Sequence, residues 1–317
     1  MSNNWQPKAS REMLEQRALL LQQVRAFFND NEVLEVETPM LGSSITCDPA
    51  LDPVVTASDQ LGQYYLLQSS PEFAMKRLLA KYKVPMYQVC KAFRKGEAGA
   101  RHNPEFTMLE WYRPGYSMEQ LMAEVWELVS GQLGLDDVET KTYRGLFQEY
   151  LDTDLISVSD NTLARTAWDK TGFSDPEADR DTLLNLLFSD CIEPHLTEAV
   201  FITDYPASQA ALAQIEEDDQ GYRIARRFEL VVDGLELANG YLELTDAVEQ
   251  ERRFEEENRI RTSRGMSLYP IDEKLLQAMK AGLPACSGVA LGLDRLLMLK
   301  TKASAISEVL AFPIADI

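Results

Sequence analysis

The dipeptide Asp233-Gly234 is the feature that most restricts how this chain folds, because it stands between two runs of strand-forming residues. Residues 227–232 precede it and residues 235–237 follow it, which predicts two antiparallel strands joined by a two-residue turn. Residues 86–94 and 106–112 form a second pair of strand-like runs, joined by a polar loop. Regular alternation of strands and helices, typical of parallel sheets, is absent. We therefore expect an α+β fold, an antiparallel sheet flanked by helices.

Other segments fit the same layout. Helices are expected where capping residues or a 3.6-residue apolar period occur, namely after Ser10, after Ser70-Pro71, at 118–133, in parts of 176–216, at 246–261 and after Gly292. Further strands are expected at 33–38, before Pro39, and at 64–68, 200–203 and 287–291.

Composition excludes several functional classes. The chain has 317 residues and a formal net charge of −20, which repels phosphate backbones and anionic lipid. No apolar run approaches the ~20 residues of a membrane helix, and no secretory signal is visible, so a cytoplasmic protein is expected. Four scattered cysteines and two histidines offer little for a zinc or iron–sulfur site. A metal would instead have carboxylate ligands, which suits Mg²⁺.

One carboxylate falls on a strand face that is otherwise apolar. Phe106, Met108, Glu110 and Tyr112 share a face by two-residue alternation. An unpaired carboxylate is costly to bury, so Glu110 faces water at a sheet edge, pairs with a lysine, or lines a pocket for an amine. The preceding loop, residues 101–105, is of the kind that wraps an anionic ligand.

Two more glutamates flank the hairpin turn. With a two-residue turn Glu229 lies opposite Ala238, so Glu229 and Glu236 are diagonal neighbours on one face, roughly 7–8 Å apart. Their repulsion is relieved by a cation between them, which makes the pair a candidate Mg²⁺ site. A solvated acidic face is the alternative.

Two further segments are expected to complete the cleft. Asn239-Gly240 predicts a second turn that returns Glu243 toward Glu236. Residues 287–295 combine small residues, which let a backbone approach a flat ligand, with Arg295 in the first turn of a helix. A positive charge at the start of a helix is unfavourable because of the helix dipole, unless an anion is bound there. The alternative is that the glycine serves packing and that Arg295 is an ordinary surface residue.

Together these segments resemble the class II aminoacyl-tRNA synthetases. The strand before Pro39 is similar to their motif one, residues 93–106 to motif two and residues 292–295 to motif three. The closest resemblance is to the lysyl branch, through residues 70–79, 101–107, 236–240 and 243–246. It covers essentially the whole chain and implies a six-stranded antiparallel sheet, a homodimer built on motif one, and the use of ATP and Mg²⁺.

The resemblance also implies roles for single residues. Arg94, Glu236 and Arg295 would be catalytic: Arg94 on the α-phosphate and the substrate carboxylate, and Arg295 on the terminal phosphates. Phe106 would stack on adenine. The nucleotide site would also include Lys95, Gly96, His102, Asn103, Glu236, Leu237 and Gly292, with Mg²⁺ on Glu229 and Glu236. The amino acid would lie among Ser70, Pro71, Glu72, Glu110, Tyr112, Asn239, Glu243 and Ala290, its side-chain ammonium on Glu110, Tyr112 and Glu243.

Three departures separate the chain from lysyl-tRNA synthetases. The first helix begins near residue 10, so residues 1–317 are expected to form a single catalytic domain without an N-terminal anticodon-binding domain. Ala290 stands where the lysyl enzymes usually have glycine, so its methyl group narrows the amino-acid pocket. Motif two reads Arg94-Lys95-Gly96-Glu97 rather than Arg-x-Glu, which leaves the adenine contact to Glu97 or to backbone.

The first two departures match the short lysyl-tRNA synthetase paralogues known as EpmA, PoxA or GenX, which attach (R)-β-lysine to a lysine of elongation factor P. This resemblance implies an ATP-dependent protein-lysine ligase whose partner is elongation factor P, with no membrane and no stable tRNA binding. The alternatives are a minimal lysyl enzyme that acylates tRNA, and an inactive paralogue that serves as a regulatory binding protein.

Overall fold

The computed structural model describes residues 5–49, 51–58, 62 and 64–317. Its strands are β1 (Leu34–Glu35), β2 (Leu41–Gly42), β3 (Leu66–Leu67), β4 (Met86–Phe93), β5 (Glu105–Pro114), β6 (Glu139–Thr142), β7 (Val200–Pro206), β8 (Ile215–Glu217), β9 (Arg223–Val232), β10 (Leu235–Leu242) and β11 (Cys286–Gly292). Its α-helices are α1 (Arg11–Asp30), α2 (Glu72–Tyr82), α3 (Met118–Leu133), α4 (Tyr143–Leu151), α5 (Asp160–Thr171), α6 (Arg180–Cys191), α7 (Ala247–Ser263), α8 (Glu273–Gly282), α9 (Leu293–Thr301) and α10 (Ile306–Val309). Short 3₁₀ turns are η1 (Glu193–His195), η2 (Ala207–Gln209) and η3 (Ile314–Asp316). Among these residues, no helix has the length and apolarity needed to cross a membrane.

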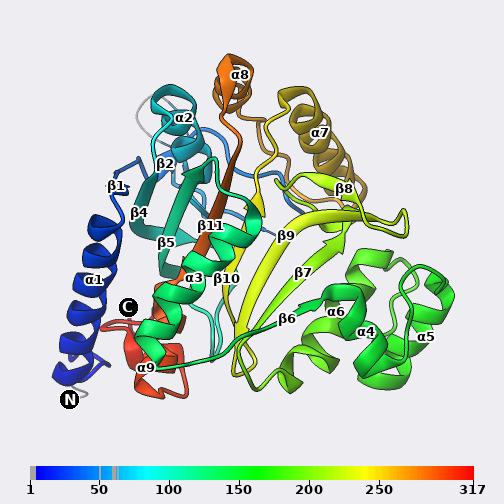
Figure 1. Cartoon of the computed structure of the whole chain (residues 1–317), viewed down its shortest axis with the longest axis horizontal. Helices are drawn as coiled ribbons and strands as arrows, with labels where there is room; N and C mark the ends of the chain where they lie inside the picture. The colour runs from blue at the N-terminus through cyan, green and yellow to red at the C-terminus, as the bar shows by residue number, and fades with distance from the viewer. Residues whose placement is uncertain (1–4, 50, 59–61, 63) are drawn as a thin grey trace.

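A single large sheet organises the molecule (Figure 1). Its strand order is β1-β4-β5-β11-β10-β9-β7-β6, with β8 paired to β9. From β4 to β7 every neighbouring pair is antiparallel, whereas β1 and β6 add in parallel at the two edges. The α+β prediction is therefore confirmed, but the predicted six strands are too few, because the sheet has nine strands within the part of the chain that the structure describes. The edge strands are short, and β6 and β8 are polar, so hydrophobic alternation does not mark them in the sequence.

The parallel pair β6–β7 explains an inserted helical lobe. Parallel neighbours need a long crossover connection, and α4, α5 and α6 supply it between β6 and β7. The lobe lies to one side of the sheet (Figure 1), and its residues Tyr143, Phe147, Leu163 and Leu187 share an apolar core with β7 and β9.

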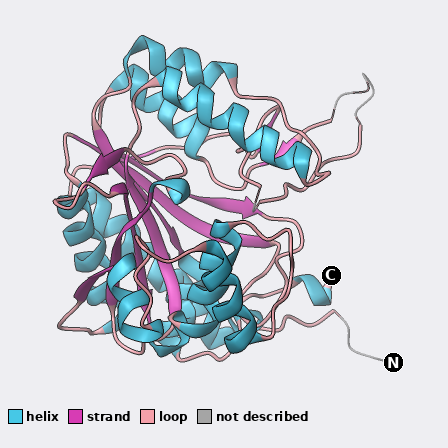
Figure 2. Cartoon of the chain, turned by 90° about the vertical axis from the view of Figure 1, so that its right-hand side faces the viewer, coloured by secondary structure: helices cyan, strands magenta, loops and turns pink. Residues whose placement is uncertain are grey.

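Strand alternation divides the sheet into a core face and an open face. Leu109, Trp111, Leu230 and Leu291 point into the main core, where they pack with α1, α3 and α9. Figure 2 shows helices on both sides of the sheet. On the second side α2, α7 and α8 form a smaller core. The residues between the core positions of β5, β9, β10 and β11 therefore face a space that these helices leave partly open.

Several predicted helix starts are confirmed by their caps. The Ser10 side chain accepts a hydrogen bond from the first turn of α1, and that of Asp246 does the same for α7. At α2 the Ser70 hydroxyl accepts from the backbone N–H of Glu72 at 3.0 Å. Gly292 is the N-cap of α9.

The β9–β10 hairpin has the predicted turn but not the predicted register. A β-bulge between Glu236 and Ala238 shifts the pairing by one residue, so Glu229 lies opposite Asn239 rather than Ala238. Glu236 still lies opposite Val231, which shares a face with Glu229. The two acids therefore point to the same side, as expected. The predicted pairing of Glu229 with Ala238, from which this was expected, is wrong.

The predicted second turn at Asn239-Gly240 is wrong, because both residues lie inside β10. Glycine is required there for another reason. A Cβ atom on Gly240 would lie 3.1 Å from the carbonyl oxygen of Gly288 and closer still to the Phe228 ring. The strand continues straight to Leu242, and Glu243 reaches the cleft from its end.

Candidate active site

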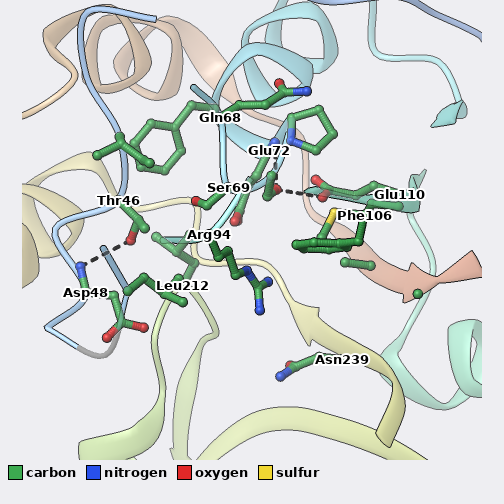
Figure 3. A pocket seen from close by; sticks show the side chains of 18 of the residues that line it. Thr46, Asp48, Gln68, Ser69, Glu72, Arg94, Phe106, Glu110, Leu212 and Asn239 are labelled. Atoms are coloured by element: carbon green, nitrogen blue, oxygen red, sulfur yellow. Dashed lines mark hydrogen bonds between the residues drawn. The ribbon is translucent and has the colours of Figure 1, made fainter. Parts of the chain in front are cut away.

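A cavity of about 570 Å³ lies over the open face of the sheet (Figure 3). The predicted site residues that line it are Ser70, Pro71, Glu72, Arg94, His102, Asn103, Phe106, Glu110, Tyr112, Glu229, Glu236, Leu237, Asn239, Glu243, Ala290, Gly292 and Arg295. Lys95 and Gly96 are exposed in the turn after β4 and are not among the lining residues, so the structure does not bring them together with the others. The backbone N–H of Lys95 instead donates to the carbonyl oxygen of Asp52 at 2.9 Å.

The floor of the cavity is one row of residues across four strands. Glu110 of β5 lies opposite Ala290 of β11, and Ala290 lies opposite Asn239 of β10. Asn239 in turn lies opposite Glu229 of β9. Residues directly opposite in antiparallel strands point to the same face, so the methyl group of Ala290 lies between a carboxylate and an amide.

Glu110 is a buried carboxylate held by two hydroxyl groups. Ser70 Oγ donates to its Oε2 at 2.6 Å and Tyr112 Oη donates to its Oε1 at 2.7 Å. Burial, with repulsion from Glu72, raises the pKa of Glu110 to about 8. The lysine pairing and the solvated edge considered above are therefore both excluded for Glu110 in the structure. An amine that enters the cavity would supply the missing positive charge.

A second acidic group forms around Lys76, which sequence reasoning gave no role. Lys76 Nζ donates to Glu72 Oε1 at 2.6 Å and forms an ion pair with Glu243 Oε2, also at 2.6 Å. Burial raises the pKa of Glu243 to about 7, while Lys76 opposes the rise. Only the helical spacing of Glu72 and Lys76 is visible in the sequence; the contact with Glu243 depends on tertiary packing.

Gly288 is a further residue that sequence reasoning did not single out as a requirement of the pocket. A Cβ atom there would lie 2.5 Å from Tyr112 Cδ1 and closer still to Glu243 Oε1. Real Cβ contacts essentially never fall below 3.0 Å. The missing side chain therefore lets Tyr112 and Glu243 approach each other over β11.

The opposite end of the cavity is cationic and aromatic. The Arg94 guanidinium lies 5.1 Å from the centroid of the Phe106 ring, and Arg94 Nη1 lies 3.6 Å from Glu97 Oε1. Arg94 Nε is buried and has no acceptor among the described residues. A buried donor of this kind is costly to leave unsatisfied, so it fits an anionic ligand.

Arg295 lies in the first turn of α9 and joins the hairpin to the motif-two loop. Its Nη1 donates to the carbonyl oxygen of Glu236 at 2.8 Å, and its Nη2 donates to His102 Nε2 at 2.7 Å. Burial, together with the positive charge of Arg295, lowers the pKa of His102. His102 is thus a neutral acceptor that holds the arginine at the mouth of the cleft.

The acids Glu229 and Glu236 offer oxygen ligands of the kind that Mg²⁺ prefers. Asn239 Nδ2 donates to Glu229 Oε1 at 3.0 Å, and Arg227 forms a short ion pair with the same oxygen. Burial and repulsion from Glu236 still raise the pKa of Glu229. This residual repulsion fits a divalent cation between the two carboxylates.

Two buried polar residues support this end of the site. Asp294 accepts hydrogen bonds from the Thr107 backbone N–H at 2.6 Å and from Arg17 Nη2 at 2.5 Å, which anchors the start of α9 beside Arg295. Asn103 Oδ1 accepts from the backbone N–H of Ile314 at 3.0 Å. Asn103 lines the cavity, but its side-chain amide is hydrogen-bonded to the backbone of Glu105 and Ile314.

An antiparallel sheet that carries an arginine–phenylalanine pair, paired acids and a helix-borne arginine around one cavity defines a class II synthetase-type catalytic domain. The chain belongs to the family of class II tRNA synthetases (D, K and N), whose sequence pattern matches residues 4–316. Curated relatives from Salmonella paratyphi B and Salmonella schwarzengrund are 47% identical over 318 residues, covering 98% of this chain and 97% of each relative. A relative from Salmonella arizonae matches to the same extent. All three are named elongation factor P–(R)-β-lysine ligase.

Proposed function

We propose that this chain is an ATP-dependent ligase that activates (R)-β-lysine and transfers it to a lysine side chain of elongation factor P. The names of relatives that match nearly the whole chain support this proposal. The observation that carries it in the structure is a single cavity that is lined both by the buried carboxylates of Glu110 and Glu243 and by the guanidinium groups of Arg94 and Arg295. Such a cavity suits a substrate that has ammonium groups at one end and a carboxylate that must meet ATP.

The amino acid would bind over the row of Glu110, Ala290 and Asn239. Glu110 and Glu243 would take the side-chain ammonium, with the Tyr112 hydroxyl holding Glu110 in place. β-Lysine carries one amino group a carbon further from its carboxylate than lysine does. The methyl group of Ala290 occupies floor space that a glycine would leave free, which favours this altered placement.

Activation would join the substrate carboxylate to the α-phosphorus of ATP and release pyrophosphate. Arg94 would bind the α-phosphate and the carboxylate, Phe106 would stack on adenine, and Arg295 would bind the terminal phosphates. These groups are already in place around the cavity, so the rate gain would come from positioning and from fixed charges. The neutral His102 would keep Arg295 oriented.

Glu229 and Glu236 would hold Mg²⁺, with Asn239 and Arg227 fixing Glu229 from behind. When bound, the ion supplies positive charge that offsets the charge of the phosphates. The protein residues orient the two carboxylates on the same face of the hairpin.

Transfer would then form an amide bond between the acyl carbon and the acceptor lysine nitrogen, while the carbon–oxygen bond to AMP breaks. The attacking amine must be neutral, so the acceptor ammonium loses its proton before or during attack. The displaced AMP leaves with the electron pair of the broken bond.

The assembly would be a homodimer. The segment around Pro39, which is similar to motif one, presents the apolar side chains of Leu34, Met40 and Leu41 to solvent in the single chain. Burial of this strip against a second copy would remove it from water. Stable tRNA binding is not expected, since the net charge of −20 opposes a polyanion.

Incubation of the purified protein with ATP, Mg²⁺ and labelled (R)-β-lysine or lysine tests the proposal, with elongation factor P or tRNA as the acceptor. Label should appear on elongation factor P, and more from (R)-β-lysine than from lysine. Label on tRNA alone would favour a minimal lysyl enzyme. Absence of amino-acid-dependent pyrophosphate exchange would favour an inactive regulatory paralogue.

A further inference from the structure

Lys76 is the most deeply buried lysine near the site, yet it is not among the residues that line the cavity. Its side chain is 1% exposed and lies behind the wall that α2 contributes. The side chains of its two partners, Glu72 and Glu243, are 16% and 1% exposed, and both line the cavity. The lysine therefore contacts the two carboxylates from the side away from the cavity.

The two ion pairs join parts of the chain that are distant in sequence. Glu72 lies one helical turn before Lys76 on α2, whereas Glu243 follows the end of β10. Each pair is 2.6 Å long, so one oxygen of each carboxylate is held by the same ammonium group. The other oxygen of Glu243 lies over Gly288, beside Tyr112. One oxygen of Glu243 is thus turned to Lys76 and the other toward the cavity.

Without a cation between them, the like charges of Glu72 and Glu243 would repel each other and turn the two carboxylates apart. An ammonium group of the substrate would then meet oxygens that are no longer directed at the cavity. Lys76 removes this problem, since its charge is satisfied by both acids, and burial strengthens each pair. A buried lysine with two carboxylate partners keeps its proton, and its pKa is raised.

We propose that Lys76 is a positioning residue for the amino-acid substrate, which holds Glu72 and Glu243 turned so that each offers an oxygen to the cavity. This inference rests on the proposed function and deepens it. It assigns amino-acid binding to a residue behind the pocket wall. It leaves the nucleotide end untouched, because the hydrogen bonds and ion pairs of Lys76 within the described residues go to Glu72 and Glu243 and not to Arg94, Arg295 or His102.

Steady-state pyrophosphate exchange tests the proposal with Lys76→Met and Lys76→Gln. Each variant should raise the KM for (R)-β-lysine on the order of 100-fold, as expected when a buried charge loses its partner. The KM for ATP and kcat should stay within about threefold, because the lost contact is made equally in the ground and transition states. Lys76→Arg restores the positive charge with a different geometry. Its KM for (R)-β-lysine should therefore be at least about tenfold lower than that of the Met and Gln variants.

Lys141→Met is the matched control. Lys141 also contacts two glutamates, Glu139 and Glu149, but it lies on β6, beside the inserted lobe. Its replacement should leave both KM values unchanged. Thermal melting of every variant separates loss of folding from loss of binding.

Several outcomes would overturn the inference. A folded Lys76→Met or Lys76→Gln protein with a near-normal KM for (R)-β-lysine is one. A parallel rise in the KM for ATP is another, and loss of folding in all three Lys76 variants is a third, because the lysine would then serve stability. Failure of the proposed function would look different: the wild-type protein itself would show no exchange with (R)-β-lysine.

Discussion

Gly288→Ala tests whether the pocket depends on the close approach of Tyr112 and Glu243 over β11. The added methyl group would lie 2.5 Å from Tyr112 Cδ1, whereas ordinary contact begins at 3.4 Å. The tyrosine ring must therefore move by about 0.9 Å, and the Glu243 carboxylate must move as well. Tyr112 holds Glu110, so the displacement reaches two of the pocket carboxylates.

The size of the effect follows from this shift. An overpacked site typically loses about 1–3 kcal/mol of folding stability. A misplacement of about 1 Å in groups that position a substrate costs on the order of 100-fold in rate. Gly288→Ala should therefore fold, melt a few degrees lower, and lose about 100-fold in kcat/KM for (R)-β-lysine.

Pyrophosphate exchange measured against both substrates, together with thermal melting, checks this prediction. The control is Gly131→Ala, because Gly131 lies inside α3 and a Cβ atom there meets nothing within 4 Å. That variant should keep full activity and gain about 1 kcal/mol of stability, since alanine favours helix over glycine. A Gly288→Ala protein with wild-type kcat/KM would refute the argument from close approach.

Three other changes probe different parts of the site. Ala290→Gly enlarges the floor by one methyl group and should raise the activation of lysine relative to (R)-β-lysine by about 10-fold or more, measured by exchange with each amino acid. Because the pKa of Glu110 is raised to about 8, this carboxyl group is protonated at pH 6 in the empty pocket. The ammonium group of the substrate must displace that proton in order to bind. The KM for (R)-β-lysine should therefore fall as the pH rises from 6 to 8 and then level off, and Glu110→Gln should flatten that profile while weakening binding. Glu236→Gln should abolish exchange of pyrophosphate into ATP, and full activity in that variant would exclude it as a metal ligand.

Local patterns in the sequence predicted where several residues of the candidate site lie. Two-residue alternation placed Glu110 on the face opposite Leu109 and Trp111, and the Asp-Gly turn placed Glu229 and Glu236 on one hairpin. Both predictions depend only on neighbours along a strand or across a tight turn. The strand predicted at 33–38 is present as the short edge strand β1, but β6 and β8 were missed because their short, polar sequences carry no period. The parallel pairings of β1 and β6 were missed as well.

The errors lie where distant residues decide the local conformation. Asn239-Gly240 has the composition of a tight turn, but the glycine is there to admit the Phe228 ring. The bulge between Glu236 and Ala238 lies in β10, which pairs with β9 on one side and with β11 on the other, and no pattern in the hairpin sequence marks it. The role of Lys76 requires Glu243, which lies on another element, so helical spacing alone identifies only half of the contact.

The row that crosses β5, β11, β10 and β9 also has a consequence for how the chain reaches its native state. If β5 paired with β11 one residue out of register, the two faces of β5 would be exchanged. Glu110 would then point into the main core, and Leu109 and Trp111 would point into the cleft. Burial of an unpaired carboxylate in that core costs several kcal/mol, which is a large share of the free energy of unfolding of a typical domain. The acids of the pocket therefore make misaligned sheets less stable than the native one. The same groups that are proposed to bind substrate thus favour the correct strand alignment during folding.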